Sequence, residues 1–199
     1  MPRPRLSVRP AYDLDDIVDI AVRVFLERGY DGTSMEDLAR AAGITKSSFY
    51  YHVSGKEEIL ERGVNRALDA LLSVLDEPGA LDGRALDRLR HILRRMVEIV
   101  AVRLPEVALL VRATGNTQTE KRALERRREF DRAVTRLVRQ AMRDGDVRAV
   151  PDPGLTTRLM LGMVVSVVGW YRPDGGTQPG ALVAAVEDLA FRGLLTCPA

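Results

Sequence analysis

The sequence predicts an all-α fold of about nine helices in two domains. Apolar residues recur at intervals of three and four along most of the chain, which is the spacing of an amphipathic helix. No run of alternating apolar and polar residues indicates a strand, and clusters of glycine and proline separate the periodic segments. We expect residues 1–55 to form an amino-terminal arm and a small three-helix domain, and residues 56–199 to form a larger helical domain.

The first domain contains three short helices. An apolar stripe that starts at Ile17 marks the first helix, which Gly29 ends. Thr33 and Glu36 have the spacing of a capping box, so we expect them to open a second helix that runs through Ala41. Gly43 then gives a tight turn, and Thr45 can cap the third helix.

Six further helices are expected after residue 55. The fourth begins near residues 55 and 56 and ends at the breaker DEPGALDG, and the fifth has its apolar stripe between residues 89 and 100. Pro105 starts a short sixth, and Thr117 with Glu120 forms a capping box for a long seventh. Asp152 and Pro153 open a helix that is apolar almost all round and is therefore expected to be buried on every side. A last striped helix runs from 178 to 195 and includes Leu194.

Composition excludes several classes of protein. Hydrophobic residues make up 46% of the 199 residues and charged residues 29%, no stretch of eighteen residues lacks charge, and no apolar segment follows the first arginines. We therefore expect a soluble, cytoplasmic protein without a membrane span or signal peptide. The single cysteine, Cys197, cannot form a disulfide within the chain. The formal charge of +2 does not by itself indicate nucleic acid.

The segment AAGI between the second and third helices has the proportions of a helix-turn-helix. In that arrangement the third helix enters the major groove and presents Thr45, Lys46, Ser47 and Ser48 to base edges and phosphates. Phe49 falls on the inner face as core, while Tyr50 and His52 can reach phosphate oxygens and Tyr51 can reach sugar or base. The spacing alone leaves an ordinary helical hairpin equally open.

The stretch GTSMEDLARAAGITKSSFYYHVSGKEEIL, with IVDIAVRVFLERGYD before it, resembles the amino-terminal signature of the TetR family of transcriptional regulators. The resemblance covers residues 17–60 and implies a homodimer that binds a double-stranded DNA operator and releases it when a small effector binds the carboxy-terminal domain. By position it implies phosphate contacts by Thr33, Tyr50, His52 and Lys56. It implies base or backbone contacts by Thr45, Lys46, Ser47, Ser48 and Tyr51, with Ser34 a further candidate. Val53 departs from the family, which usually has a large aromatic residue there.

The amino-terminal arm has two interpretations. Arg3, Arg5 and Arg9 lie in a proline-spaced segment that can reach a minor groove. The alternative is a tail that makes no DNA contact.

The second domain is expected to dimerise and to bind the effector. Helices 154–171 and 178–195 can form a four-helix bundle with their two-fold mates. The candidate effector-binding residues are Met96, Val100, Arg103, Arg112, Met163 and Trp170, and plain core or dimer packing is the alternative for each. The segment from Val167 to Leu194 resembles the end of family members that sense fatty-acyl or steroid-derived coenzyme A thioesters, which implies a long lipophilic slot with Arg103 and Arg112 at its mouth.

No set of residues indicates catalysis, a cofactor or a metal. His91 is isolated in sequence, and two histidines with one cysteine make neither a zinc set nor a Cys–His dyad. The arginine-rich segment ERRREFDR, residues 125–132, is interpreted as a solvated helix face, because its acidic residues stand at salt-bridge spacing. Two alternatives to a ligand-responsive repressor remain, a ligand-independent DNA-binding protein and a helical carrier or enzyme that does not use DNA.

Overall fold

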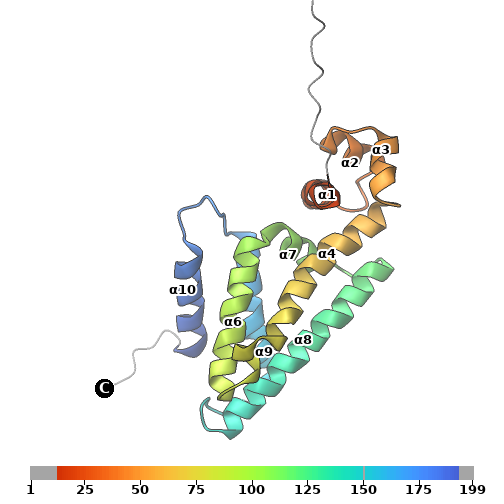
Figure 1. Cartoon of the computed structure of the whole chain (residues 1–199). Coiled ribbons are helices and arrows are strands. Elements are labelled where there is room, and N and C mark those ends of the chain that lie inside the picture. Colours follow the sequence, from red (N-terminus) through yellow and green to blue (C-terminus); the bar gives the residue numbers. More distant parts are fainter. Residues whose placement is uncertain (1–12, 150, 193–199) are drawn as a thin grey trace, which may run out of the picture. The chain divides into compact units, whose positions relative to one another are not determined.

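The computed structural model describes residues 13–149 and 151–192, and all regular structure in these ranges is helical (Figure 1). The chain divides into two compact units, residues 1–63 and 64–199. The long helix α4 (Lys56–Ser73) crosses this division. The expected boundary between residues 55 and 56 falls at the start of α4 and stays a prediction.

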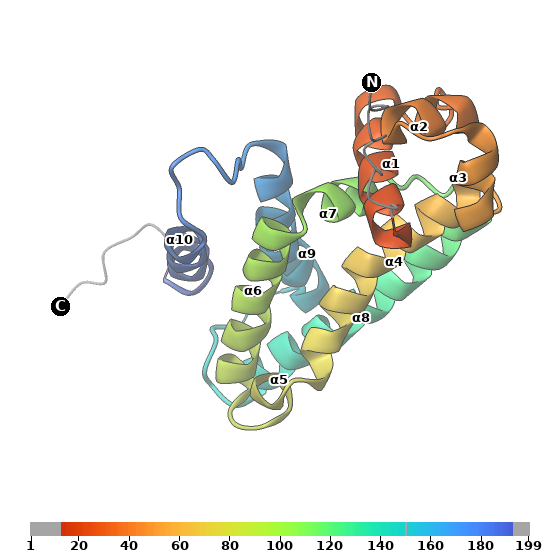
Figure 2. The same ribbon diagram turned by 45° about the horizontal axis from the view of Figure 1, so that its top comes forward.

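The first unit contains α1 (Leu14–Arg28), α2 (Met35–Ala42), α3 (Lys46–His52) and the start of α4 (Figure 2). Asp13 caps α1 in a capping box with Asp16, and Gly29 ends the helix with φ +80°. The apolar stripe of α1, which includes Ile17, Ala21 and Phe25, is buried. Three helices of seven to fifteen residues are thus held by one small core.

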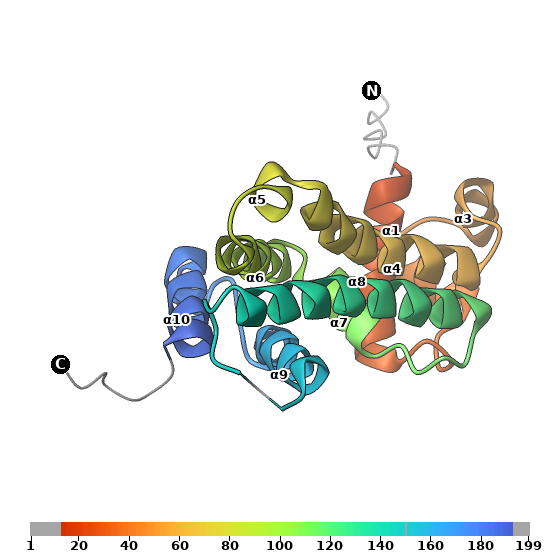
Figure 3. The ribbon, with the colours of Figure 1, turned by 90° about the horizontal axis from the view of Figure 1, so that it is seen from below.

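The second unit is built around α6 (Ala85–Val102), which packs against α5 (Pro78–Leu81), α8 (Gln118–Arg143), α9 (Pro153–Ser166) and α10 (Pro179–Phe191) (Figure 3). The remaining elements are α7 (Leu104–Val111) and the short helices η1 (Val74–Asp76) and η2 (Val167–Gly169). Thr117 and Glu120 form the predicted capping box of α8, and Asp152 caps α9 ahead of Pro153. The predicted core stripes of α6 and α8 are buried.

The all-α fold is confirmed, and the details of three helices differ from expectation. The described residues form ten α-helices where about nine were expected, and the additional short helix α5 lies inside the expected breaker. The capping box of α2 pairs Ser34 with Asp37, one residue later than predicted. Within one chain α9 buries only Thr157, Leu161 and Val164, so it is not covered on every side. Arg3, Arg5, Arg9, Leu194 and Cys197 lie outside the described residues.

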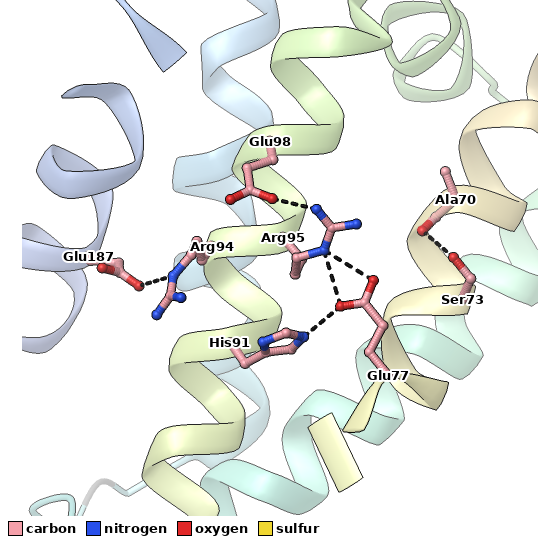
Figure 4. Close-up of polar contacts among 8 residues, drawn as sticks. All are labelled: Ala70, Ser73, Glu77, His91, Arg94, Arg95, Glu98 and Glu187. Carbon is pink, nitrogen blue, oxygen red and sulfur yellow. Dashed lines mark hydrogen bonds and ion pairs between the residues drawn. The ribbon is translucent and has the colours of Figure 1, made fainter. Parts of the chain in front are cut away.

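A polar cluster fixes α5 to α6 (Figure 4). Glu77, just before α5, lies 2.6 Å from Nε2 of His91 and accepts hydrogen bonds of 3.0 and 3.1 Å from Nε of Arg95. Burial alone would raise the pKa of Glu77, but these hydrogen bonds outweigh it and lower the pKa. A Cβ at Gly79 would lie 2.4 Å from the His91 ring, so only glycine fits there. His91, isolated in sequence, therefore has a structural partner.

None of the described helices is both long and apolar enough to cross a membrane.

Candidate DNA-binding and effector sites

The turn between α2 and α3 sets the geometry of the helix pair. Gly43 has φ +66°, a left-handed conformation that glycine adopts without steric cost. Its N–H donates to the carbonyl of Arg40 (3.1 Å), and the N–H of Ile44 donates to the carbonyl of Ala39 (3.1 Å). These two bonds close the end of α2 and direct the chain into α3.

One face of α3 is buried and the other is open. Thr45 caps the helix by accepting from the N–H of Ser48 (3.1 Å), as predicted. Phe49 is buried, which confirms its predicted place in the core. Val53 is also buried, so a side chain smaller than the aromatic residue usual in the family still closes this end of the core.

The structure brings most of the predicted contact residues together on this open face. Tyr50 is 46% exposed and Tyr51 88% exposed, and the rings of Tyr51 and His52 meet edge to face at 5.5 Å. The exposed polar residues at the start of the helix are Thr45, Lys46, Ser47 and Ser48. Hydroxyls, an ammonium and an imidazole on one short helix are donors suited to phosphate oxygens and base edges.

Ser34 lies at the open amino-terminal end of α2. Its hydroxyl accepts from the N–H of Asp37 (3.2 Å) and stands 2.6 Å from the Asp37 carboxylate. Hydrogen bonds from Ser34 lower the pKa of Asp37, with smaller contributions from Arg40 and Arg28. Both Thr33/Glu36 and Ser34/Asp37 fit the capping-box spacing, so the sequence did not decide between the two registers.

Thr33 and Lys56, which were expected to contact phosphates, also make hydrogen bonds within the protein. Thr33 is only 2% exposed, and its hydroxyl donates to the carbonyl of Gly29 (2.7 Å). Nζ of Lys56 donates to the carbonyls of Tyr30 (3.0 Å) and Thr33 (3.3 Å) and lies 4.4 Å from the Tyr30 ring centre. Both side chains hold the loop between α1 and α2, and their phosphate contacts stay predictions.

The second unit holds an apolar cavity of ≈ 40 Å³. Its walls come from α4, α6, α7, α8 and α9, and Met96 is the one predicted effector residue among them. The lining residues are Leu68, Leu71, Leu72, Met96, Val107, Leu110, Val111, Arg127, Phe130, Asp131, Leu161 and Val165. The expected effector slot stays a prediction, since a cavity of this size holds no more than a few small groups.

The other predicted effector residues lie elsewhere. Val100 is buried on α6, and Met163 is half-buried on α9. Trp170 is 56% exposed. Arg103 caps the end of α6 and lies 3.8 Å from Glu106, while Arg112 ends α7. None of the five lines the cavity.

The charged residues at the cavity come from the segment that was interpreted as a solvated face. Asp131 and Arg127 line the cavity and also an adjoining hollow of ≈ 300 Å³ that includes Arg128 and Arg158. Burial raises the pKa of Asp131, against the opposing effect of Arg127, Arg158 and Arg132. Helical periodicity marks which residues share a face, but the position of α9 decides that this face borders a cavity.

Among the described residues no three His, Cys, Asp or Glu side chains gather at a distance suited to a metal ion.

Two family models match the chain. The model of bacterial regulatory proteins of the tetR family matches residues 17–62, and the model of the tetracyclin repressor-like carboxy-terminal domain matches residues 82–194. The first includes the α2–α3 pair, and the second includes α6 through α10.

Relatives and solved structures agree with these matches. The negative transcriptional regulator IcaR of the biofilm operon icaADBC from Staphylococcus epidermidis is 41% identical over 73 residues, which is 35% of this chain and 40% of that protein. A crystal structure of a TetR transcriptional regulator from Streptomyces coelicolor is 54% identical, with a TM-score of 0.86 over 90% of this chain and 91% of that one.

A further structure, AibR in complex with isovaleryl coenzyme A and operator DNA, is 27% identical, with a TM-score of 0.75 over 89% of this chain and 97% of that one. Since the carboxy-terminal model alone spans more than half of the 199 residues and the amino-terminal model coincides with the helix-turn-helix, the chain belongs to the TetR family of bacterial regulatory proteins.

Proposed function

We propose that the protein is a homodimeric transcriptional repressor that binds a pseudo-palindromic operator and releases it when a lipophilic effector enters the second unit. The observation that carries the DNA-binding part is the open face of α3, where an ammonium, three rings and several hydroxyls stand above a buried Phe49. A dimer presents two such helices to half-sites about one DNA turn apart. The similarity to IcaR, a negative regulator, favours repression.

The contacts divide by chemistry. Tyr50 and His52 donate to phosphate oxygens, and Ser34, whose hydroxyl donates to Asp37 in this structure, is a further candidate for such a contact. Lys46, Ser47, Ser48 and Tyr51 face bases or the neighbouring backbone, and Thr45 adds a hydroxyl at the start of α3. Thr33 and Lys56 act through the shape of the α1–α2 loop.

Exposed apolar surface on α9 and α10 supports the dimer. Leu155 and Leu159 stand one turn apart on α9 and are 48% and 67% exposed, and Leu189 on α10 is 44% exposed. Apolar side chains at this spacing form a stripe that is stabilised when a second copy covers it. In such a dimer one face of α9 packs against the core of its own chain and another face packs against the partner, so apolar residues are needed all round the helix.

The effector is proposed to be an acyl-CoA thioester whose acyl chain enters the apolar cavity. The lining is hydrophobic apart from Arg127 and Asp131, and AibR, with a similar fold, binds isovaleryl coenzyme A. At ≈ 40 Å³ the cavity is far smaller than the ~300–1,000 Å³ of ligand pockets. The effector thus requires a widened state, and this difference in affinity between two states is what can shift the protein away from DNA.

The test is fluorescence anisotropy on DNA from directly upstream of the protein's own coding sequence, at fixed salt, with acyl-CoA thioesters of graded chain length. We expect tight binding that one thioester reverses. Val165→Phe, which fills the cavity wall, should keep operator binding and lose the response, whereas Val102→Phe at a 79% exposed position should keep both. Tight binding that no thioester reverses would overturn the effector proposal and leave DNA binding intact.

A further inference from the structure

A second hollow, separate from the apolar cavity, is lined by arginines. It measures ≈ 590 Å³ and is lined by residues of η1, α5, α6 and the carboxy-terminal half of α8. We call it the arginine groove. Its lining residues are Leu75, Ala80, Leu81, Arg88, Ile92, Ala133, Arg136, Leu137, Arg139, Gln140 and Arg143. None of them lines the apolar cavity.

The lining of this groove contains four arginines and no carboxylate. No ion pair is recorded within the described ranges for Arg88, Arg136 or Arg139, and Arg88 donates through Nε to the carbonyl of Ala80 (2.7 Å). Arg143 stands in the last turn of α8, where a cation also balances the helix dipole. The lining of the groove therefore carries four positive charges and no negative charge.

Two of the acidic residues on neighbouring elements are engaged by other partners. Glu77, next to α5, is held by His91 and Arg95 (Figure 4). Asp146, after α8, is bound by Arg84. These pairs keep two nearby carboxylates from neutralising the groove.

The floor of the groove is apolar. Leu75 and Leu81 come from η1 and α5, and Leu137 comes from α8, with Ala80, Ile92 and Ala133 between them. Leu81 is 54% exposed, so it offers a contact surface rather than core. Guanidinium groups bind phosphate oxygens through paired hydrogen bonds, and neighbouring apolar side chains can contact a flat, weakly polar ring. The groove therefore suits a ligand that has both parts.

We propose that the arginine groove binds a nucleoside polyphosphate. The phosphates would take Arg136, Arg139 and Arg88, and the base would lie on Leu81 and Leu75. The volume is within the usual range of small-molecule sites, ~300–1,000 Å³. The groove is a separate site from the proposed effector cavity, because the two sets of lining residues are disjoint.

Isothermal titration calorimetry on the full-length protein, without DNA or acyl-CoA, tests the proposal with ATP, tripolyphosphate and adenosine. We expect ATP to bind most tightly, tripolyphosphate more weakly and adenosine weakest, since only ATP uses both parts of the groove. Arg139→Gln should weaken ATP about tenfold, the effect of one charge-assisted hydrogen bond. Leu81→Ser should weaken ATP and leave tripolyphosphate unchanged.

The matched control is Arg132→Gln, an exposed arginine on the same helix that does not line the groove. It removes the same charge and should leave ATP affinity unchanged. An equal loss in Arg132→Gln and Arg139→Gln would mean general attraction to a basic helix and would overturn the proposal. Absence of ATP binding at millimolar concentration would overturn it too, and neither result bears on operator release.

Discussion

Lys56 offers a direct test of whether a conspicuous cation at the DNA-binding unit acts on DNA or on the fold. Its Nζ donates to two backbone carbonyls and lies over the Tyr30 ring. Hydrogen bonds from a charged group contribute ~1.5–3 kcal/mol each when buried, and a half-exposed cation–π contact ~0.5–1 kcal/mol. Because Lys56 is only part-buried, we take about 2 kcal/mol for the whole arrangement.

The perturbation is Lys56→Met, which keeps the apolar stem and removes the donors. We expect the free energy of unfolding of the first unit to fall by roughly 2 kcal/mol in urea, followed by circular dichroism. DNA affinity should fall because the α1–α2 loop loosens, while the slope of log K against log salt stays the same. That slope changes by about 0.9 for each lost phosphate contact.

Lys46→Met is the matched comparison, since Lys46 is exposed at the start of α3. It should leave the unfolding free energy unchanged and weaken DNA binding. The reasoning about Lys56 is refuted if Lys56→Met leaves stability intact and lowers the salt slope by about one unit, because the ammonium would then act on a phosphate.

Three further substitutions follow from the same structure. Hydrogen bonds from the N–H of Ser54, then from Arg62 and the Ser54 hydroxyl, lower the pKa of Glu58 from 4.5 to about 2. Ionised Glu58 therefore stabilises the fold above pH 4.5, and this stabilisation is lost as the pH falls toward 2. Glu58→Gln should lower the free energy of unfolding, measured by urea titration, by about 1 kcal/mol at pH 7 after a discount for solvent screening, and by almost nothing at pH 2. Burial raises the pKa of Asp131, so its ionised form destabilises the fold above that pKa. Asp131→Asn should therefore raise the melting temperature at pH 7 but not below pH 3.8. A lower melting temperature of the variant at pH 7 would contradict this. Tyr51→Ala, at an 88% exposed position, should leave the melting temperature unchanged and weaken operator binding about tenfold, and equal operator affinity would remove Tyr51 from the contact set.

The amino-terminal unit could be predicted from sequence because its signals are local. Thr45 as cap, Gly43 as turn and Phe49 as core each depend on neighbours within four residues, and the structure has all three as expected. The roles of Thr33 and Lys56 could not be predicted in this way. The Lys56 contact to Tyr30 spans 26 residues of sequence, and periodicity carries no information about pairs so far apart.

The second unit shows the same limit more strongly. The stripes on α6 and α8 follow from helical spacing, but whether a charged residue faces solvent or a hollow depends on the helices packed beside it. Asp131 borders a cavity because α9 passes next to it, and Arg103 does not because it pairs with Glu106 at the end of α6. The arginine-flanked slot stays a prediction, and the arginine that lines the apolar cavity is Arg127 rather than Arg103 or Arg112.

One helix connects the two hollows of the second unit. Arg127, Phe130 and Asp131 of α8 line the apolar cavity, and Ala133 and Arg136, on the next turn, line the arginine groove. A ligand that widens the cavity must displace side chains on α4, α6, α7, α8 or α9, and a shift of α8 would carry Ala133 and Arg136 with it. Linkage is reciprocal, so a nucleotide that favours one position of α8 would change acyl-CoA affinity by the same factor as acyl-CoA changes nucleotide affinity. The arrangement thus allows two chemically different ligands of the second unit to influence one another through the position of a single helix.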